Sequence, residues 1–399
     1  MTRSNCSRFA GLVLAGSLLY GLKGDAHKPI TSPYTYNDDV FPILRDRCGR
    51  CHVPGGVAPM SLMTYKDAYP WGESIRTELI AGHMPPWPVE EGHSHFKNAR
   101  VLTARELNVL LTWVTGGNPL GDPDRSADPP SLRRTWSLGE PDLALTPPAD
   151  YSLAADKAED IAEFTFSPAM TGDRWVRAVD LLPGNPAVVR SATVAVRTRA
   201  AQQDRAGEGP ERTLALWVPG EDPVPLDAGT AFRIPASAQI VARVHYKKTW
   251  EYERKTMTDR STLGLYFTPA PATEVRAITL HATDADARNG QVSFSRTLDE
   301  EVRILALYLD PALVNAMLTV RAARPDGSGT ELIRLRQQPD WVRRYWFEHP
   351  LALPRGTRIE VSAAFDAPLL PPGAVPLPAT PAAAEPVQVT LDVVAPHQP

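Results

Sequence analysis

The sequence is poor in cysteine, with three in 399 residues. So few thiols exclude the dense disulfide framework of small secreted domains. Positive charge is not in excess either, because 42 lysines and arginines face 46 aspartates and glutamates, for a net charge of −4. Nucleic acid is therefore not an expected partner. The length and a hydrophobic content of 43% predict roughly two to three globular domains.

Long apolar runs are also scarce, and the one that stands out spans residues 9–22, after two arginines. About 14 residues are short for a membrane-spanning helix, which needs roughly 20. Small and polar residues follow the run, so we interpret 1–26 as a signal peptide cleaved near Ala26, with a retained membrane anchor as the alternative. The expected localisation is periplasmic or exported. Cys6 leaves with this segment.

The two cysteines that remain, Cys48 and Cys51, are followed directly by His52 in the sequence RCGRCHVPGG. A disulfide, a redox-exchange site and half of a zinc site can each use a CxxC pair, but none of them requires the next residue to be histidine. Covalent c-type haem uses all three residues, as two thioethers and a proximal iron ligand. We therefore predict one haem c held by Cys48, Cys51 and His52.

Two amphipathic patterns flank this motif. Residues 37–48 have a capping side chain at Asn37 and then periodic apolar residues, which predicts a helix leading into the motif. Residues 103–117 begin with Thr103 and Glu106 in capping-box spacing and continue with periodic leucines. The motif is therefore expected in a small helical domain.

The distal haem ligand is expected between these helices, in the sequence GHMPPWP. Its prolines keep Met84 out of a helix interior, and a methionine thioether is a common sixth ligand of haem iron. We predict Met84 in this role. His83 is an alternative ligand, and Met84 could instead fill the core like Met60 and Met63. Met60 follows His52 by only eight positions, too few to cross the haem comfortably.

Residues 36–123 resemble the bacterial cytochrome c module that precedes a copper type II, ascorbate-dependent monooxygenase-like region. The resemblance rests on VFPILRDRCGRCHVPGG, on GHMPPWP and on LTARELNVLLTWVTGGNPLGDP. In that family the CxxCH motif binds haem, and the methionine before the prolines is the distal ligand. The resemblance thus implies the same four haem residues here, Cys48, Cys51, His52 and Met84.

Beyond a stretch rich in Gly, Pro, Asp and Ser, the chain changes to short alternating or β-branched runs such as RWVRAVDLL, VRSATVAVRT and VRILALYLD. Turn sequences such as PGED and PDGSG separate them, which predicts antiparallel β-sandwiches rather than α/β units. About 230 residues of this pattern predict two stacked sandwiches. Residues 139–366 also resemble the two jelly-roll halves of the copper monooxygenase-like family, which implies a peptidylglycine monooxygenase-like fold.

The expected fold is a multidomain chain, with a small all-α cytochrome c domain followed by two all-β jelly-roll sandwiches. Most of the 40 prolines lie in connecting segments and near the C-terminus, as expected for short strands joined by stiff loops. The expected parts are a signal peptide at 1–26, the haem domain at 27–123, a linker at 124–138, the first sandwich at 139–268, the second at 269–370 and a Pro/Ala-rich tail at 371–399.

The copper positions implied by the resemblance are mostly lost. Copper-binding members are expected to carry a His-His pair after the PGN turn, where this chain has Arg190 and Ser191. At the expected His-x-His pair, His245 remains but Lys247 replaces its partner, and an ammonium group has no lone pair to offer copper. His245 is then a vestigial copper position, and we expect no bound copper.

Other potential metal ligands give no clear pattern. Tyr308 and Asp310 replace a further His-x-His pair that the resemblance implies. Asp310 and His281 could supply substitute ligands, but nothing in their spacing requires a site. His93 and His95 have metal-like spacing, although solvated imidazoles in a surface loop explain them more simply.

Three functions of different classes fit these observations. We favour an exported electron carrier that uses one haem, with the degenerate sandwiches as a scaffold or docking surface for a periplasmic redox partner. The second is a haem-fed copper monooxygenase, an oxidoreductase that the missing histidines argue against. The third is a structural subunit of a periplasmic redox complex, which could include a membrane-associated respiratory complex. The aromatic stretch at 246–257 is a candidate contact, with a solvated hairpin as the simpler interpretation.

Overall fold

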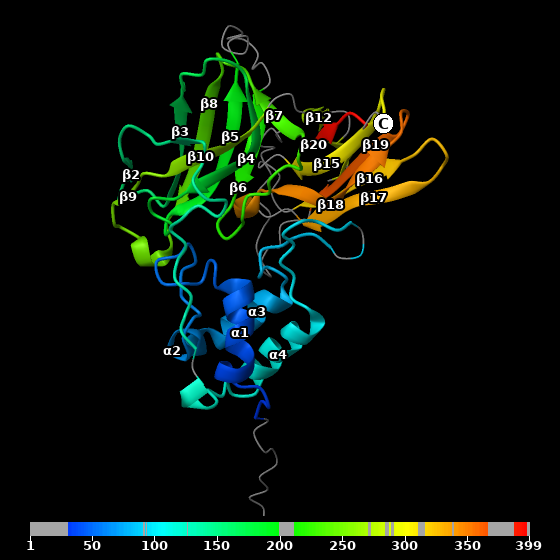
Figure 1. Ribbon diagram of the computed structural model, residues 1–399. Helices are drawn as coiled ribbons and strands as arrows, with labels where there is room; N and C mark the ends of the chain where they lie inside the picture. Colours follow the sequence, from blue (N-terminus) through cyan, green and yellow to red (C-terminus); the bar gives the residue numbers. More distant parts are fainter. Residues whose placement is uncertain are drawn as a thin grey trace, which may run out of the picture.

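The computed structural model shows a short helical region followed by two β-sandwich regions that lie side by side (Figure 1). The expectation of this coarse architecture is confirmed. The expected signal peptide at 1–26 lies outside the described residues. The structure describes residues 31–396 except for 91, 93, 126, 199–210, 270–272, 284–286, 289–290, 310–315, 337–338 and 366–386.

The helical region begins at residue 36. Its first segment is capped by Thr35, not by Asn37, whose side chain lies inside the first turn and donates to the Asp122 carbonyl at 2.7 Å. The capping box of Thr103 and Glu106 is confirmed. No helix of the described chain is both long and apolar enough to span a membrane. The helical elements are η1 (Tyr36–Val40), α1 (Phe41–Ile43), η2 (Leu44–Cys48), α2 (Tyr65–Ala68), η3 (Tyr69–Trp71), α3 (Gly72–Ile80), α4 (Ala104–Thr115) and η4 (Pro123–Arg125).

A compact aromatic core fixes these short helices. Trp113 of α4 is fully buried and donates from its indole nitrogen to the Pro119 carbonyl at 3.1 Å. Tyr36 of η1 packs against it with ring centroids 6.0 Å apart, and its hydroxyl donates to the Leu62 carbonyl at 2.9 Å. Because both rings are buried and their polar atoms are satisfied, they hold η1 and α4 together. Leu44 of η2 joins the same core, which fixes the helix end that carries Cys48.

The first sandwich packs a five-stranded sheet on a four-stranded one, with alternate side chains buried between them. All of its strand pairs are antiparallel except the β7–β11 pair. Its first sheet has the order β1 (Leu143–Leu145), β10 (Thr262–Thr268), β4 (Arg174–Leu182), β7 (Thr230–Ile234) and β11 (Thr273–Glu274). Its second sheet has the order β3 (Glu159–Phe166), β8 (Gln239–Lys247), β5 (Val189–Arg197) and β6 (Arg212–Trp217), and β2 (Tyr151–Leu153) pairs with β9 (Met257–Asp259).

The second sandwich contains a strand that sequence analysis had assigned to a C-terminal tail. Residues 388–394 form β20, which lies between two other strands and buries Val389, Leu391 and Val393 completely. The expected tail at 371–399 is therefore wrong at its end, because alternate apolar side chains there fill the second core. One sheet has the order β12 (Arg276–His281), β20 (Gln388–Val394), β15 (Val302–Leu309) and β18 (Arg344–Leu353). The other has the order β13 (Ala287–Arg288), β14 (Gln291–Thr297), β19 (Arg358–Phe365), β16 (Ala316–Ala323) and β17 (Gly329–Arg336).

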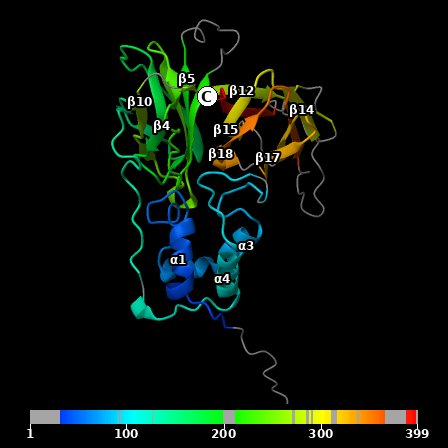
Figure 2. The same ribbon diagram turned by 45° about the vertical axis from the view of Figure 1, so that its right-hand side comes forward.

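A segment of the expected haem domain also belongs to the second sandwich. The chain after α3 runs up from the helices to the strands and returns to α4 (Figure 2). Val89 forms an isolated bridge with Leu335, and Phe96 forms one with Phe347. Both side chains lie in the second sandwich core. The boundary at 27–123 is thus wrong for these residues, because burying Val89 and Phe96 requires a sheet that the small helical region lacks.

The two sandwiches are joined by Arg344 of β18. Its guanidinium group donates to the carbonyls of Leu214 at 2.5 Å and Thr213 at 2.9 Å, both on β6. Its Nε lies 2.8 Å from Asp392 of β20, and both side chains are buried. Burial raises the pKa of Asp392, although the nearby guanidinium acts in the opposite direction. One buried cation therefore ties together β6, β18 and β20.

Candidate haem site

A cavity of about 360 Å³ lies where the helical region meets the sandwiches. Its volume falls in the range of roughly 300–1,000 Å³ that is typical of small-molecule and cofactor pockets. Cys48, Cys51, His52 and Met84 all line it. The structure thus brings together the four residues that the sequence assigned to haem, from the end of η2, the turn after it and the loop after α3.

The turn that carries the motif is tight and depends on glycine. The backbone N–H groups of Cys51 and His52 both donate to the Cys48 carbonyl, at 3.1 and 3.0 Å. A Cβ atom on Gly49 would lie 2.5 Å from the Arg45 carbonyl oxygen, and one on Gly56 would lie 2.3 Å from that of Cys51. Any larger residue at these two positions would push the turn apart. The two glycines therefore allow the tight turn that carries Cys48, Cys51 and His52.

The imidazole of His52 is oriented by a single hydrogen bond. Its Nδ1 lies 3.1 Å from the Met60 carbonyl oxygen. A carbonyl can only accept, so Nδ1 carries the hydrogen and the lone pair is on Nε2. Burial lowers the pKa of His52, which also favours the neutral ring. A neutral imidazole with Nδ1 bonded to a carbonyl is the usual arrangement of a metal-binding histidine.

The two thiols form no disulfide. Burial raises the pKa of Cys48 to about 12 and that of Cys51 to about 11. Thiol–disulfide exchange needs a thiolate, so these pKa values argue against a redox-exchange site. Among the residues described, no cluster of three or more His, Cys, Asp or Glu side chains is arranged to hold a metal ion.

Met84 and its neighbour His83 have different surroundings. Met84 is half-buried and lines the cavity. The His83 side chain is 61% exposed, and its Nδ1 lies 3.1 Å from a carboxylate oxygen of Glu78. This geometry favours Met84 over His83 as a distal ligand. Met63 is a buried core residue, whereas Met60 lines the cavity and is only half-buried.

One wall of the cavity comes from the first sandwich. The loop 218–222 between β6 and β7 contributes Pro219, Gly220 and Glu221. The Pro219 carbonyl oxygen lies 3.7 Å from the Cys51 sulfur. Gly220 has φ +79°, and a Cβ there would lie 3.1 Å from the same sulfur. A glycine is needed here for both conformation and space.

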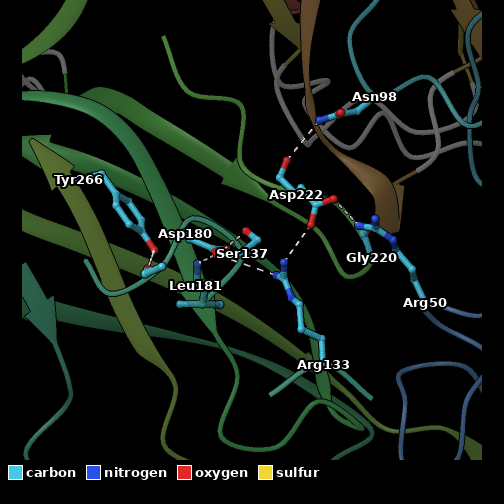
Figure 3. Close-up of polar contacts among 10 residues, drawn as sticks. Arg50, Asn98, Arg133, Ser137, Asp180, Leu181, Gly220, Asp222 and Tyr266 are labelled. Carbon is cyan, nitrogen blue, oxygen red and sulfur yellow. Dashed lines mark hydrogen bonds and ion pairs between the residues drawn. The ribbon is translucent and has the colours of Figure 1, made fainter. Parts of the chain in front are cut away.

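Asp222 fastens this loop to the helical region. Its carboxylate pairs with Arg50 at 2.5 Å and with Arg133 of the connecting segment at 2.9 Å (Figure 3). Its backbone carbonyl accepts from the Asn98 side chain at 3.2 Å. Arg133 also lies 3.8 Å from the buried Asp180 of β4. Two segments of the chain thus bind the Asp222 carboxylate and a third binds its backbone carbonyl, which fixes how the sandwich sits over the cavity.

Two of the implied copper positions lie next to each other on β5 and β8. Ser191 of β5 lies opposite His245 of β8 in the strand register. The His245 Nε2 lies 3.5 Å from a Glu159 carboxylate oxygen, and Lys247 pairs with Asp340 at 2.7 Å. Lys247 is therefore held by an acid, whereas Arg190 lies in the cavity wall.

The remaining metal candidates are scattered. Tyr308 of β15 lies beneath the Arg344 guanidinium, 4.9 Å from ring centroid to carbon. His281 and His95 are exposed on separate elements. Asp310 and His93 lie outside the described residues.

Sequence analysis missed the arginines of the cavity wall. Five arginines and only two glutamates line it, and they come from distant parts of the sequence. Arg47 pairs with Glu106 at 3.0 Å, and Arg343 pairs with Glu221. No local spacing pattern could have grouped them, because the fold alone brings them together. Their positive charge suits a ligand that carries anionic groups.

Comparison with known proteins adds little. No protein-family model matches the chain, and no curated protein sequence matches it. Solved structures match only distantly. An allantoicase structure is 9% identical over 48% of this chain and 69% of its own, with a TM-score of 0.16, and the Saccharomyces cerevisiae allantoicase is 7% identical over 60% and 79%, with a TM-score of 0.19. The infectious bursal disease virus VP2 subviral particle is 12% identical over 64% and 79%, with a TM-score of 0.17.

Replacing Asp222 by Asn should loosen the docked loop without unfolding either sandwich. The change removes two partly exposed ion pairs, each worth roughly 0.2–1 kcal/mol, so opening should become roughly 2- to 30-fold more frequent. Hydrogen–deuterium exchange should rise in peptides covering 218–222 and 48–56. Asp173→Asn is a matched control, because its ion pair with Arg233 lies within the first sandwich. Equal exchange in Asp222→Asn and wild type would show that Asp222 does not fasten the loop.

Proposed function

We propose that this chain is an exported c-type cytochrome that transfers electrons through one covalently bound haem. The observation that carries the proposal is the convergence of Cys48, Cys51 and His52 on a cavity that Met84 also lines. On this proposal Cys48 and Cys51 would hold the haem through thioether bonds, and His52 Nε2 and Met84 Sδ would bind its iron. The haem would supply one-electron redox chemistry, and the protein holds its ligands and keeps water away.

An electron carrier fits this ligand set better than a gas-binding or oxygen-activating haem protein. Two protein ligands leave no open position on the iron, and methionine raises the reduction potential relative to harder donors. The wall of the cavity is largely apolar, with Leu44, Leu79 and Leu110 among its residues. Such a lining excludes water and fixes the surroundings of the haem in both redox states.

We further propose that the helical region is a cytochrome c domain and that the sandwiches are degenerate copper monooxygenase-like jelly rolls. The ion pair of Lys247 with Asp340 at 2.7 Å supports the loss of copper, because this ammonium group is already bound to an acid. The sandwiches then serve as a scaffold or docking surface for a periplasmic redox partner. A role as subunit of a larger redox complex is the second candidate. Trp250, which is 60% exposed, supports such a contact.

Covalent attachment can be tested on exported protein in a denaturing gel. Wild-type protein should stain for haem, and the haem should resist acid acetone, because thioether bonds survive both treatments. Cys51→Ala should prevent stable incorporation. Cys6→Ala is the matched control and should stain like wild type, since Cys6 lies outside the motif. Haem that is extracted by acid acetone from the wild type would refute covalent attachment.

The distal ligand can be tested by spectroscopy of the ferric protein. Thioether coordination gives a weak charge-transfer band at the edge of the near infrared, and Met84→Ala should abolish it. The variant should also bind exogenous ligands and have a potential lower by on the order of 100 mV, a fraction of the roughly 0.8 V that axial ligands span. Met60→Leu removes another thioether of the cavity and should keep the band. A band that survives in Met84→His would rule Met84 out.

Copper content separates the carrier from a monooxygenase. After incubation with Cu(II) and desalting, elemental analysis should give about one iron and far less than one copper per chain, because copper monooxygenation needs several neutral imidazoles. Ascorbate and oxygen should yield no hydroxylated product. Near one copper per chain that is lost in His245→Ala would instead support the monooxygenase. Trace copper that persists in His245→Ala would indicate adventitious binding, for example at His93 and His95.

A further inference from the structure

Two guanidinium groups line the haem cavity without an anionic partner. Arg100 lies on the return of the long loop before α4, and Arg190 lies on β5 of the first sandwich. Within the part of the chain that the structure describes, neither group forms an ion pair or side-chain hydrogen bond, and the Nε of Arg190 is completely buried without a partner. The nearest acid to Arg190 that influences its pKa is Asp340, which already pairs with Lys247.

The backbone directs Arg190 toward the cavity. In the pairing of β5 with β8, Val189 lies opposite Tyr246 and Ser191 lies opposite His245, so Arg190 is the extra residue of a β-bulge. A bulge leaves one residue without a partner in the ladder and turns its side chain away from the regular alternation. Here the redirected side chain enters the cavity wall.

A charged guanidinium group that is buried in the cavity wall without an ion-pair partner lowers the stability of the fold, because it loses its hydration. Burial lowers the pKa of both Arg100 and Arg190. The positive charge of Arg50 lowers that of Arg100 further, and the acids Asp222 and Glu221 offset this only in part. Arginine nevertheless remains charged in proteins, so the cost must be offset by an anion. Three of the five arginines in the wall already pair with acids, Arg47 with Glu106, Arg50 with Asp222 and Arg343 with Glu221, which leaves Arg100 and Arg190 without one. A ligand with carboxylate groups would remove this imbalance.

We propose that Arg100 and Arg190 bind the two propionate carboxylates of the haem, so that the first sandwich completes the haem site. The inference rests on the proposed function, because that function supplies the haem. Thioether formation uses the vinyl groups and leaves the propionates as the anionic groups of the porphyrin. The guanidinium fork matches a carboxylate with two parallel hydrogen bonds. Arg190 occupies a position where the resemblance implies a copper-binding histidine. Arginine there cannot bind copper, but it can donate hydrogen bonds to a carboxylate.

The test uses the full holoprotein with Arg190→Gln and Arg100→Gln, which remove the charge and keep a polar side chain. Each variant should have a lower reduction potential, because a cation near the haem favours the reduced state. At the wild-type midpoint potential, the ratio of oxidised to reduced protein should rise roughly tenfold, the order expected for one partly buried charge. The propionate bending band in resonance Raman spectra should move to lower frequency. Arg190→Lys keeps the positive charge, so its reduction potential should stay close to that of the wild type. It loses the forked hydrogen bonds, so its propionate bending band should still move to lower frequency.

The control is Arg233→Gln, which removes an exposed arginine from the same sandwich and should leave both readouts unchanged. If Arg190→Gln and Arg100→Gln retain covalent haem and the methionine band, yet show wild-type potential and Raman spectra, the propionate assignment is wrong and the cytochrome proposal stands. A wild-type protein without covalent haem would overturn both. Should Arg190→Gln fail to fold, Arg190→Lys still decides the question through the Raman band.

Discussion

The packing of the loop 218–222 against the turn that carries Cys51 is the contact on which the rest of the site depends. Gly220 allows the approach, and Asp222 holds it through Arg50 and Arg133. This contact makes a sandwich loop into a wall of the cavity. The candidate haem site is therefore a property of the assembled chain, and docking of the domains and formation of the site are one event.

Buried arginines lie at the contacts between the helical region and the two sandwiches. Buried arginines join separate parts of the chain wherever the sheets and helices meet: Arg343 reaches the Pro86 carbonyl and Glu221, and Arg344 reaches β6 and Asp392. Buried pairs of this kind contribute little net stability, because both ions lose their hydration. They do restrict the possible arrangements, since any other docking would leave a buried ion unpaired. Relative orientation is thus fixed by polar contacts, while the cores themselves are apolar.

The sequence predicted those features that local patterns determine. The capping box at Thr103 and the alternating strands depend on neighbours within a few positions, and both are present in the structure. The strand at 388–394 was missed because it follows a Pro/Ala-rich stretch and gains its partners from β12 and β15. Arg190 was seen as a lost copper ligand, and its place in the cavity wall follows from a bulge that spacing alone does not reveal.

The segment between α3 and α4 packs into the second sandwich, so the helical region is not an independent domain of the chain. Val89 and Phe96 pair with residues about 250 positions later, so the helical region closes a very large loop when it folds. Contacts of such high sequence separation form slowly. A gene fragment cut after the helices would leave these two apolar side chains in water and the Met84 loop without its anchor. A protein expressed to study the helical region should therefore include the second sandwich, whose core holds these two side chains.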